Sequence, residues 1–186
     1  MIRVTWALLL SAFLSLPSYA LKAYDLKIPD DLNFAEQPLV LNGAGMRTKF
    51  FHDIYVAVLY LPEPSSDAEG IIAADAPLNI RIYIVSDLIT GERFAESAMD
   101  GFVRSTHGNL EPIRSEVDAM IATFRNALKN GDVFDLVYLP EEGVRIYRNG
   151  EQLELVPGLA FKQAMTGIWL SDDPVQTRLR DKMLGN

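Results

Sequence analysis

The side chain with the clearest chemical potential in this sequence is Arg47. It follows the glycine-rich segment Asn42-Gly43-Ala44-Gly45, which is expected to form a turn, and precedes a run rich in Ile, Val and Tyr. A guanidinium is permanently charged and carries five N–H donors in a planar fork, so it needs an anionic partner wherever it is partly buried. Spacing leaves two interpretations open: Arg47 binds an anionic ligand, or it is an exposed turn residue paired with an Asp or Glu.

The other motifs that carry chemistry are missing from the sequence. There is no phosphate-binding P-loop and no Gly-x-Ser-x-Gly nucleophile elbow. His52 and His107 are far apart and have no carboxylate pair at ligand spacing, and the chain has no cysteine. We therefore expect no metal, no cofactor and no catalytic nucleophile.

Composition limits the classes of partner. The chain has 186 residues, 49% of them hydrophobic, which is enough for one domain with its own core. Its formal net charge of −8 disfavours sequence-independent binding to nucleic acid, because that requires a basic face. The same charge disfavours an anionic membrane surface.

Residues 1–20 have the features of a secretory signal peptide. Arg3 supplies a positive start, Val4 to Leu16 is almost entirely apolar, and Ser18-Tyr19-Ala20 offers small residues for cleavage after Ala20. The apolar run is too short to span a bilayer, which needs about 20 residues. We expect a mature domain of residues 21–186 that is exported to the periplasm and makes no stable membrane insertion.

The mature segment alternates between strand and helix signals. Pro112 is expected to start one helix, and Asn149-Gly150 marks a hairpin turn. This order predicts an α+β domain, an antiparallel sheet with helices packed on one face. The expected strands are 39–41, 50–61, 78–86, 133–139, 144–148 and 152–156, and the expected helices are 91–105, 112–128, 160–170 and one from about 173 to 185.

Apolar residues recur at helical spacing on two of these helices. They are Phe94, Phe102, Phe161, Met165 and Ile168. Such a stripe usually belongs to a fully packed interior, and it is also compatible with a ligand-lined cleft between sheet and helices. The sequence leaves both alternatives open.

Four segments resemble the chalcone isomerase-like family, in particular its bacterial exported branch. They are Leu41-Asn-Gly-Ala-Gly-Met-Arg-Thr-Lys-Phe-Phe51, Tyr55-Val-Ala-Val-Leu-Tyr-Leu61, Ser86-Asp-Leu-Ile-Thr-Gly91 and Ile168-Trp-Leu-Ser-Asp-Asp-Pro174. The resemblance implies an open-faced β-sandwich, in which a large antiparallel sheet is backed by helices with a ligand cleft between them. In true isomerases of the family an arginine, matching Arg47, stabilises negative charge on the substrate.

The remaining isomerase residues do not carry over. Their threonine falls at Tyr55, their helix tyrosine at Phe94, their asparagine at Gly101, and the hydroxyl residue of the last helix near Lys162. Three of these positions lack equivalent hydrogen-bonding groups, so the resemblance does not imply chalcone cyclisation.

Fatty-acid-binding relatives use the same arginine with a tyrosine to hold a carboxylate. Tyr55 is the expected partner, but eight residues of straight strand span about 26 Å. The chain must therefore bend or bulge near residues 48–50, or the partner is Tyr83 on the next strand. We expect ligand contacts from Arg47, Tyr55, Tyr83, Phe94, Phe102 and Lys162.

The leading hypothesis is a periplasmic, non-catalytic binding protein for a fatty acid or similar amphipathic carboxylate. One alternative is an intramolecular lyase or isomerase that uses the same arginine on another substrate. A second is a structural envelope interaction module, in which Arg47 forms a salt bridge and the cleft is filled. A void lined by Arg47 would separate the first two from the third.

Overall fold

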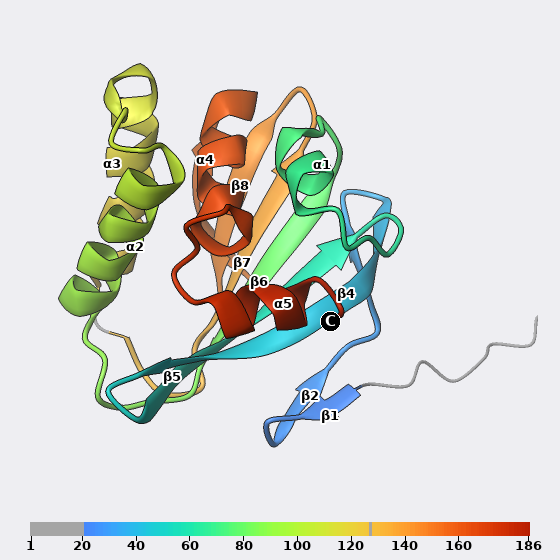
Figure 1. Ribbon diagram of the computed structural model, residues 1–186, viewed down its shortest axis with the longest axis vertical. Helices are drawn as coiled ribbons and strands as arrows, with labels where there is room; N and C mark the ends of the chain where they lie inside the picture. The colour runs from blue at the N-terminus through green and yellow to red at the C-terminus, as the bar shows by residue number, and fades with distance from the viewer. Residues whose placement is uncertain (1–20, 127) are drawn as a thin grey trace, which may run out of the picture.

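The computed structural model describes residues 21–126 and 128–186, so the expected signal peptide lies outside the described residues. The main feature is a seven-stranded antiparallel sheet in which every strand pairs with its neighbour in sequence (Figure 1). Its strands are β3 (Asp31–Phe34), β4 (Gln37–Lys49), β5 (His52–Leu61), β6 (Leu78–Ile84), β7 (Val133–Leu139), β8 (Gly143–Arg148) and β9 (Glu151–Val156).

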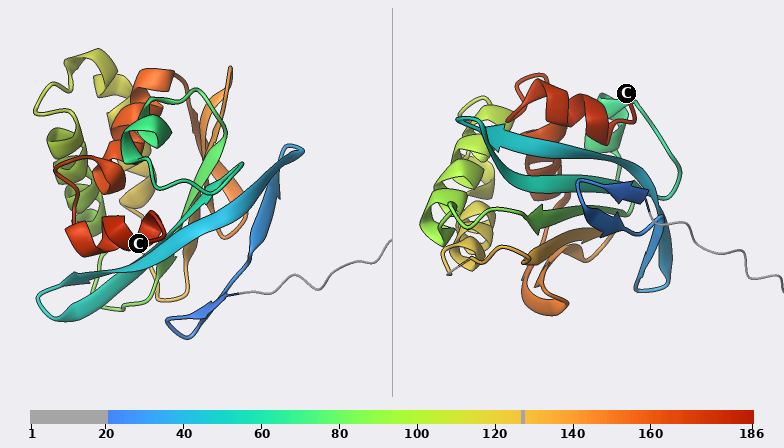
Figure 2. Two further views of the ribbon diagram at one scale, coloured as in Figure 1. Left: turned by 45° about the vertical axis from the view of Figure 1, so that its right-hand side comes forward. Right: turned by 90° about the horizontal axis from the view of Figure 1, so that it is seen from below.

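Helices cover one face of this sheet, and a small hairpin lies on the other side (Figure 2). The hairpin pairs β1 (Leu21–Ala23) with β2 (Leu26–Ile28). The helical elements are α1 (Ala68–Ala73), α2 (Gly91–Ser105), the short 3-10 turn η1 (Glu111–Ile113), α3 (Arg114–Phe124), α4 (Leu159–Leu170) and α5 (Thr177–Met183). The expected α+β class, with an antiparallel sheet backed by helices, is confirmed.

β5 is the central strand of the core. Every residue from Ile54 to Leu61 is buried, because alternate side chains enter two different apolar clusters. One cluster lies between the sheet and the helices and includes Ala57 and Leu59. The other lies behind the sheet, where Val56 and Val58 pack with Ile28 of the small hairpin.

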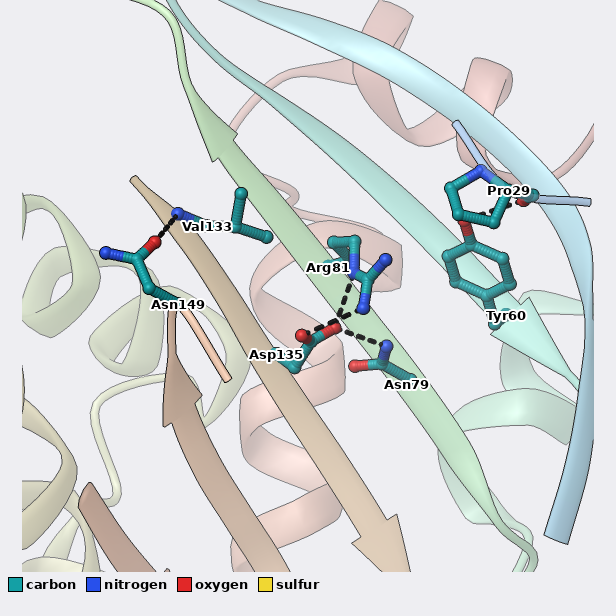
Figure 3. Close-up of polar contacts among 7 residues, drawn as sticks. All are labelled: Pro29, Tyr60, Asn79, Arg81, Val133, Asp135 and Asn149. Atoms are coloured by element: carbon teal, nitrogen blue, oxygen red, sulfur yellow. Dashed lines mark hydrogen bonds and ion pairs between the residues drawn. The ribbon is translucent and has the colours of Figure 1, made fainter. Parts of the chain in front are cut away.

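The outer face of the sheet also contains a polar network (Figure 3). Arg81 donates to both carboxylate oxygens of Asp135, from Nε at 2.7 Å and from Nη2 at 3.0 Å. Asn79 donates to the same carboxylate at 2.7 Å. This bidentate pair ties β6 to β7, which is why charged residues occur within two otherwise apolar strands.

The glycine-rich segment is part of a strand, which corrects the expectation of a turn at residues 42–45. β4 runs through it without interruption, and α5 crosses it closely. A Cβ at Gly43 would lie 2.2 Å from the carbonyl oxygen of Lys182, and one at Gly45 would lie 2.7 Å from Leu179. The glycines therefore allow the helix to approach the strand, a role that composition does not distinguish from turn formation.

The expected strand over residues 50–61 is also corrected, at its start. Phe50 and Phe51 form a two-residue turn between β4 and β5, with φ angles of 49° and 66°. Two positive φ angles define a type I′ hairpin turn, which usually contains Asn-Gly. Two phenylalanines gave no turn signal, so this hairpin was missed.

Several short elements differ from expectation for a related reason. The strands β1 to β3 and the helix α1 were not expected, because segments of three to six residues show too little periodicity. The helix expected over 112–128 is shorter: Pro112 lies in η1, and α3 covers Arg114–Phe124.

Lys162 of α4 stabilises the end of α1. Its side chain is fully buried, and Nζ donates to the carbonyl oxygens of Ile71, Ile72 and Ala74 at 2.7, 3.0 and 2.7 Å. These carbonyls belong to the last turn of α1, whose C-terminal oxygens attract a cation. Burial lowers the pKa of Lys162 to about 8, so the ammonium remains largely charged at neutral pH.

We expect Lys162→Met to lower the free energy of unfolding by about 2 kcal/mol, because it leaves three carbonyls without their donor. Lys182→Met is the matched control, since Lys182 is exposed and its Nζ donates only to the carbonyl oxygen of Asn186 within the described structure. Urea unfolding of both variants gives the comparison. Equal stability of Lys162→Met and the parent protein would contradict a role in capping α1.

Candidate functional site

A pocket of about 540 Å³ opens beside the β4–β5 hairpin and the start of α2. Its volume lies in the range of small-molecule sites, about 300–1,000 Å³. The loop between β6 and α2 closes its other side through Leu88 and Ile89. The lining residues are Arg47, Lys49, Phe50, His52, Ile54, Tyr55, Leu88, Ile89, Arg93, Phe94, Glu96, Ser97 and Asp100.

The hairpin brings Arg47 and Tyr55 together. They are directly paired across β4 and β5, and a register shift follows at Thr48. Side chains of directly paired residues leave the same face of a sheet about 5 Å apart. The bend that was expected near residues 48–50 is therefore a complete reversal of the chain at the hairpin turn. The side chains of Arg47 and Tyr55 both line the pocket.

Arg47 is half-buried and forms no ion pair with the described residues. Its Nη1 donates to the carbonyl of Thr48 at 2.9 Å and to Oε1 of Gln176 at 3.2 Å. The same Oε1 accepts from the backbone N–H of Thr48 at 3.1 Å. Neutral acceptors therefore orient the guanidinium and leave its charge uncompensated, with Nε and Nη2 making no hydrogen bond within the described structure.

Tyr55 presents a neutral phenol beside this cation. Its hydroxyl oxygen accepts a hydrogen bond from Nε1 of Trp169 at 3.1 Å. Burial raises the pKa of Tyr55, although the bond from Trp169 and the charge of Arg47 act in the opposite direction. Because the oxygen already accepts from Trp169, the phenolic hydrogen is available to donate to another group.

The charges around the pocket are mixed, with a positive excess. Arg47, Lys49 and Arg93 line it together with Glu96 and Asp100. This local balance contrasts with the net charge of −8 for the whole chain. The described residues contain no group of three or more His, Asp or Glu side chains suited to a metal ion.

The interior beyond Tyr55 is nearly filled. A void of about 20 Å³, lined by residues such as Phe94, Ile168 and Trp169, lies behind it, which is room for little more than one water molecule. Phe102 is fully buried and stacks on Phe161 with ring centroids 5.6 Å apart. The sequence left open a deep cleft or a packed interior beside the apolar residues of the helices. The structure has the packed interior.

Three expected site residues lie away from the pocket. Tyr83 pairs with Val56 and packs in the cluster behind the sheet, because it alternates with the inward residues Ile82 and Ile84. Lys162 holds the end of α1, as described above. Phe102 is a core residue, so among the six expected positions Arg47, Tyr55 and Phe94 line the pocket and Tyr83, Phe102 and Lys162 do not.

Sequence reasoning missed the two residues that orient this pair. Trp169 lies in one of the segments quoted for the family resemblance, but nothing there indicated a contact with Tyr55. Gln176 follows Pro174 in the loop before α5 and has no distinctive sequence context. Both contacts join positions more than 100 residues apart, beyond the reach of local patterns.

Comparison with known proteins agrees with this architecture. The family model described as chalcone isomerase-like matches residues 20–185. The chain belongs to the chalcone isomerase-like family. Among solved structures, the fatty-acid binding protein of Arabidopsis thaliana matches with a TM-score of 0.68 at 13% sequence identity, over 89% of this chain and 95% of that protein. No curated protein sequence matches the chain.

Within the chalcone isomerase-like fold, the pocket lies at one end of the sheet. Helix α2 approaches α4 closely at Gly101, where a Cβ would be 2.7 Å from Ile168. Glycine at position 101 allows this close helix packing, because a larger residue would clash with Ile168. No helix of the described chain is long and apolar enough to cross a membrane.

We expect Tyr55 to contribute to stability below pH 10 and to lose that contribution as the pH rises further. Its folded-state pKa is raised, so the unfolded chain releases the phenolic proton first and unfolding becomes easier in alkali. Tyr55→Phe is expected to lose about 1–2 kcal/mol at neutral pH, because Trp169 N–H loses its acceptor.

Urea unfolding between pH 7 and 11 measures both effects. Tyr55→Phe should show a smaller alkaline loss of stability than the parent protein, whereas Tyr24→Phe, at an exposed tyrosine, serves as the control. Identical alkaline profiles of Tyr55→Phe and the parent protein would contradict the buried, protonated phenol.

Proposed function

We propose that this protein binds a fatty acid, or another monocarboxylate with an apolar tail, in the Arg47 pocket. The observation that carries the proposal is an uncompensated guanidinium beside a neutral phenol in an open pocket. Arg47 supplies charge and N–H donors from Nε and Nη2, and Tyr55 supplies an O–H donor. A carboxylate accepts from both types of donor.

The surroundings favour an anion with an apolar tail over a small polar anion. Ile54, Ile89 and Phe94 line the pocket beside the polar pair, and Leu88 and Phe50 extend this surface to the mouth. Because the interior behind Tyr55 is packed, the tail is proposed to follow this open pocket. It would not run between the sheet and the helices.

The proposed role is binding without catalysis. The position where isomerases of the family carry a helix tyrosine is Phe94 here, which has no hydroxyl group. Gly101 replaces an asparagine and serves helix packing. Arg47 thus lacks two of the polar partners that the isomerases of the family carry.

A fatty-acid ligand has a precedent among proteins of this fold. The matched Arabidopsis protein is a fatty-acid binding protein that shares this fold along nearly its whole length. At 13% identity the likeness concerns the fold. The ligand class is proposed from the pocket itself.

Arg47→Ala is expected to weaken the binding of dodecanoate by about 10- to 100-fold, the worth of a charge-assisted hydrogen bond. Dodecanol, which has the same tail and no charge, should bind the parent protein and the variant within about twofold of each other. Isothermal titration calorimetry with both ligands separates the head group from the tail. Arg47→Lys should recover part of the affinity, because it restores the charge without the fork.

Arg114→Ala is the matched control, since Arg114 is an exposed arginine on α3 that pairs with Asp118. It should bind dodecanoate like the parent protein. If Arg47→Ala and Arg114→Ala bind dodecanoate equally well, or if neither ligand binds the parent protein, the proposed function is wrong.

We also propose that the protein is exported to the periplasm, on the strength of residues 1–20 alone. Expression of the full-length gene in a Gram-negative host, followed by intact-mass measurement of the periplasmic fraction, tests this point. A chain that begins at Leu21 is the expected product. A chain that keeps residues 1–20 and stays in the cytoplasm would contradict export.

A further inference from the structure

The turn between β4 and β5 places two large apolar side chains in solvent. Phe50 is 82% exposed and Phe51 is 102% exposed, the highest values among the exposed large hydrophobic residues of the described chain. The turn forms the free end of a hairpin that projects from the sheet (Figures 1 and 2). Phenylalanine side chains of this size are normally buried, so their exposure calls for a partner.

The backbone of this turn is also unfavourable for phenylalanine. Both residues adopt left-handed φ angles, 49° and 66°, a region where bulky side chains are rare. The chain uses the favoured pair Asn149-Gly150 between β8 and β9, and its other two such turns, Tyr24-Asp25 and Ala35-Glu36, each contain an acidic residue suited to solvent. Neither solubility nor turn geometry accounts for phenylalanine here, and strained exposed residues of this kind concentrate at functional sites.

The turn is continuous with the mouth of the pocket. Phe50 lines the pocket, and so do its neighbours Lys49 and His52. Across the mouth lies Leu88, which is 58% exposed. The pocket therefore opens to solvent between exposed apolar side chains on both sides.

We propose that the Phe50-Phe51 turn inserts into the surface of an electrically neutral phospholipid bilayer and brings the pocket mouth against the lipid. Insertion would allow a fatty acid to exchange between the bilayer and the pocket, and this purpose rests on the proposed function. Lys49, whose Nζ lies 5.9 Å from the centre of the Phe50 ring, extends toward the head-group region.

A lipid surface fits the turn better than a protein partner does. Two phenylalanine side chains offer at most about 500 Å² of contact area, whereas a typical stable protein interface buries about 800 Å² on each partner. A narrow, convex tip gives a second copy of this chain little to pack against. A fluid bilayer, by contrast, surrounds an inserted aromatic side chain on all sides.

Charge sets the type of lipid. The chain as a whole carries −8, which opposes close approach to an anionic bilayer. The pocket mouth carries a mixture of basic and acidic side chains, so insertion depends on the apolar tip. Two rings anchor more weakly than a long acyl chain, which itself binds reversibly, so the contact is brief and suited to exchange.

Fluorescence quenching by brominated phosphatidylcholine vesicles tests insertion directly. The reporter is Phe51→Trp in the exported chain of residues 21–186, whose own tryptophan, the buried Trp169, is a constant background. The matched control is Leu155→Trp in the same chain, because Leu155 is 42% exposed on β9 at the opposite edge of the sheet. We expect quenching at position 51 to exceed that at position 155 at least threefold.

Equal quenching at positions 51 and 155 would overturn the proposal. So would a change of the Phe51→Trp emission with protein concentration in the absence of vesicles, because it would show that a second copy covers the turn. Neither measurement uses a fatty acid. Insertion at the turn is therefore decided separately from the Arg47 experiments.

Phe51→Gly tests the purpose of insertion. Phe51 does not line the pocket, and glycine is favoured at this position of a type I′ turn, so the variant should unfold at the same or a higher temperature. We expect transfer of dodecanoate from neutral vesicles to slow at least threefold, with unchanged affinity for dissolved dodecanoate. Leu155→Asn should transfer at the parent rate. A parent-like rate for Phe51→Gly would contradict exchange through the turn.

Discussion

The pairing of Arg47 with Tyr55 across the β4–β5 hairpin is the constraint on which the site depends. A shift of one residue in this register would turn one of the two side chains to the opposite face of the sheet. The register is held by β5, whose residues from Ile54 to Leu61 are buried on both faces of the sheet. The burial of the apolar strand β5 therefore fixes the position of Tyr55 relative to Arg47 on β4.

The orientation of this pair comes from residues late in the chain. Trp169 at the end of α4 donates to Tyr55, and Gln176 before α5 accepts from Arg47. Gly43 and Gly45 permit α5 to lie directly on β4, which brings Gln176 within reach. The groups that accept hydrogen bonds from Arg47, the carbonyl of Thr48 and the side-chain amide of Gln176, are both neutral. Arg47 is thus held in place without the carboxylate that would neutralise it and compete with a ligand.

The sequence predicted the architecture well and the site in part. Long periodic segments such as 91–105 and the apolar run at 54–61 were identified because burial imposes regular patterns. The Phe50-Phe51 turn was missed because its residues contradict the chemistry of a type I′ turn. Tyr83, Phe102 and Lys162 lie away from the pocket, since the face of a strand, the packing of a core ring and the partner of a buried lysine depend on tertiary structure.

The central claim is that Arg47 holds the ionised form of a carboxylate. It is tested most directly by NMR titration of dodecanoate labelled with ¹³C at its carboxyl carbon and bound to the protein. The account predicts that the bound carboxyl stays ionised down to a pH below the range of about 4–5 typical of an exposed carboxyl. A carboxyl pKa raised above that range on binding would show an apolar environment without the guanidinium, and would contradict the account.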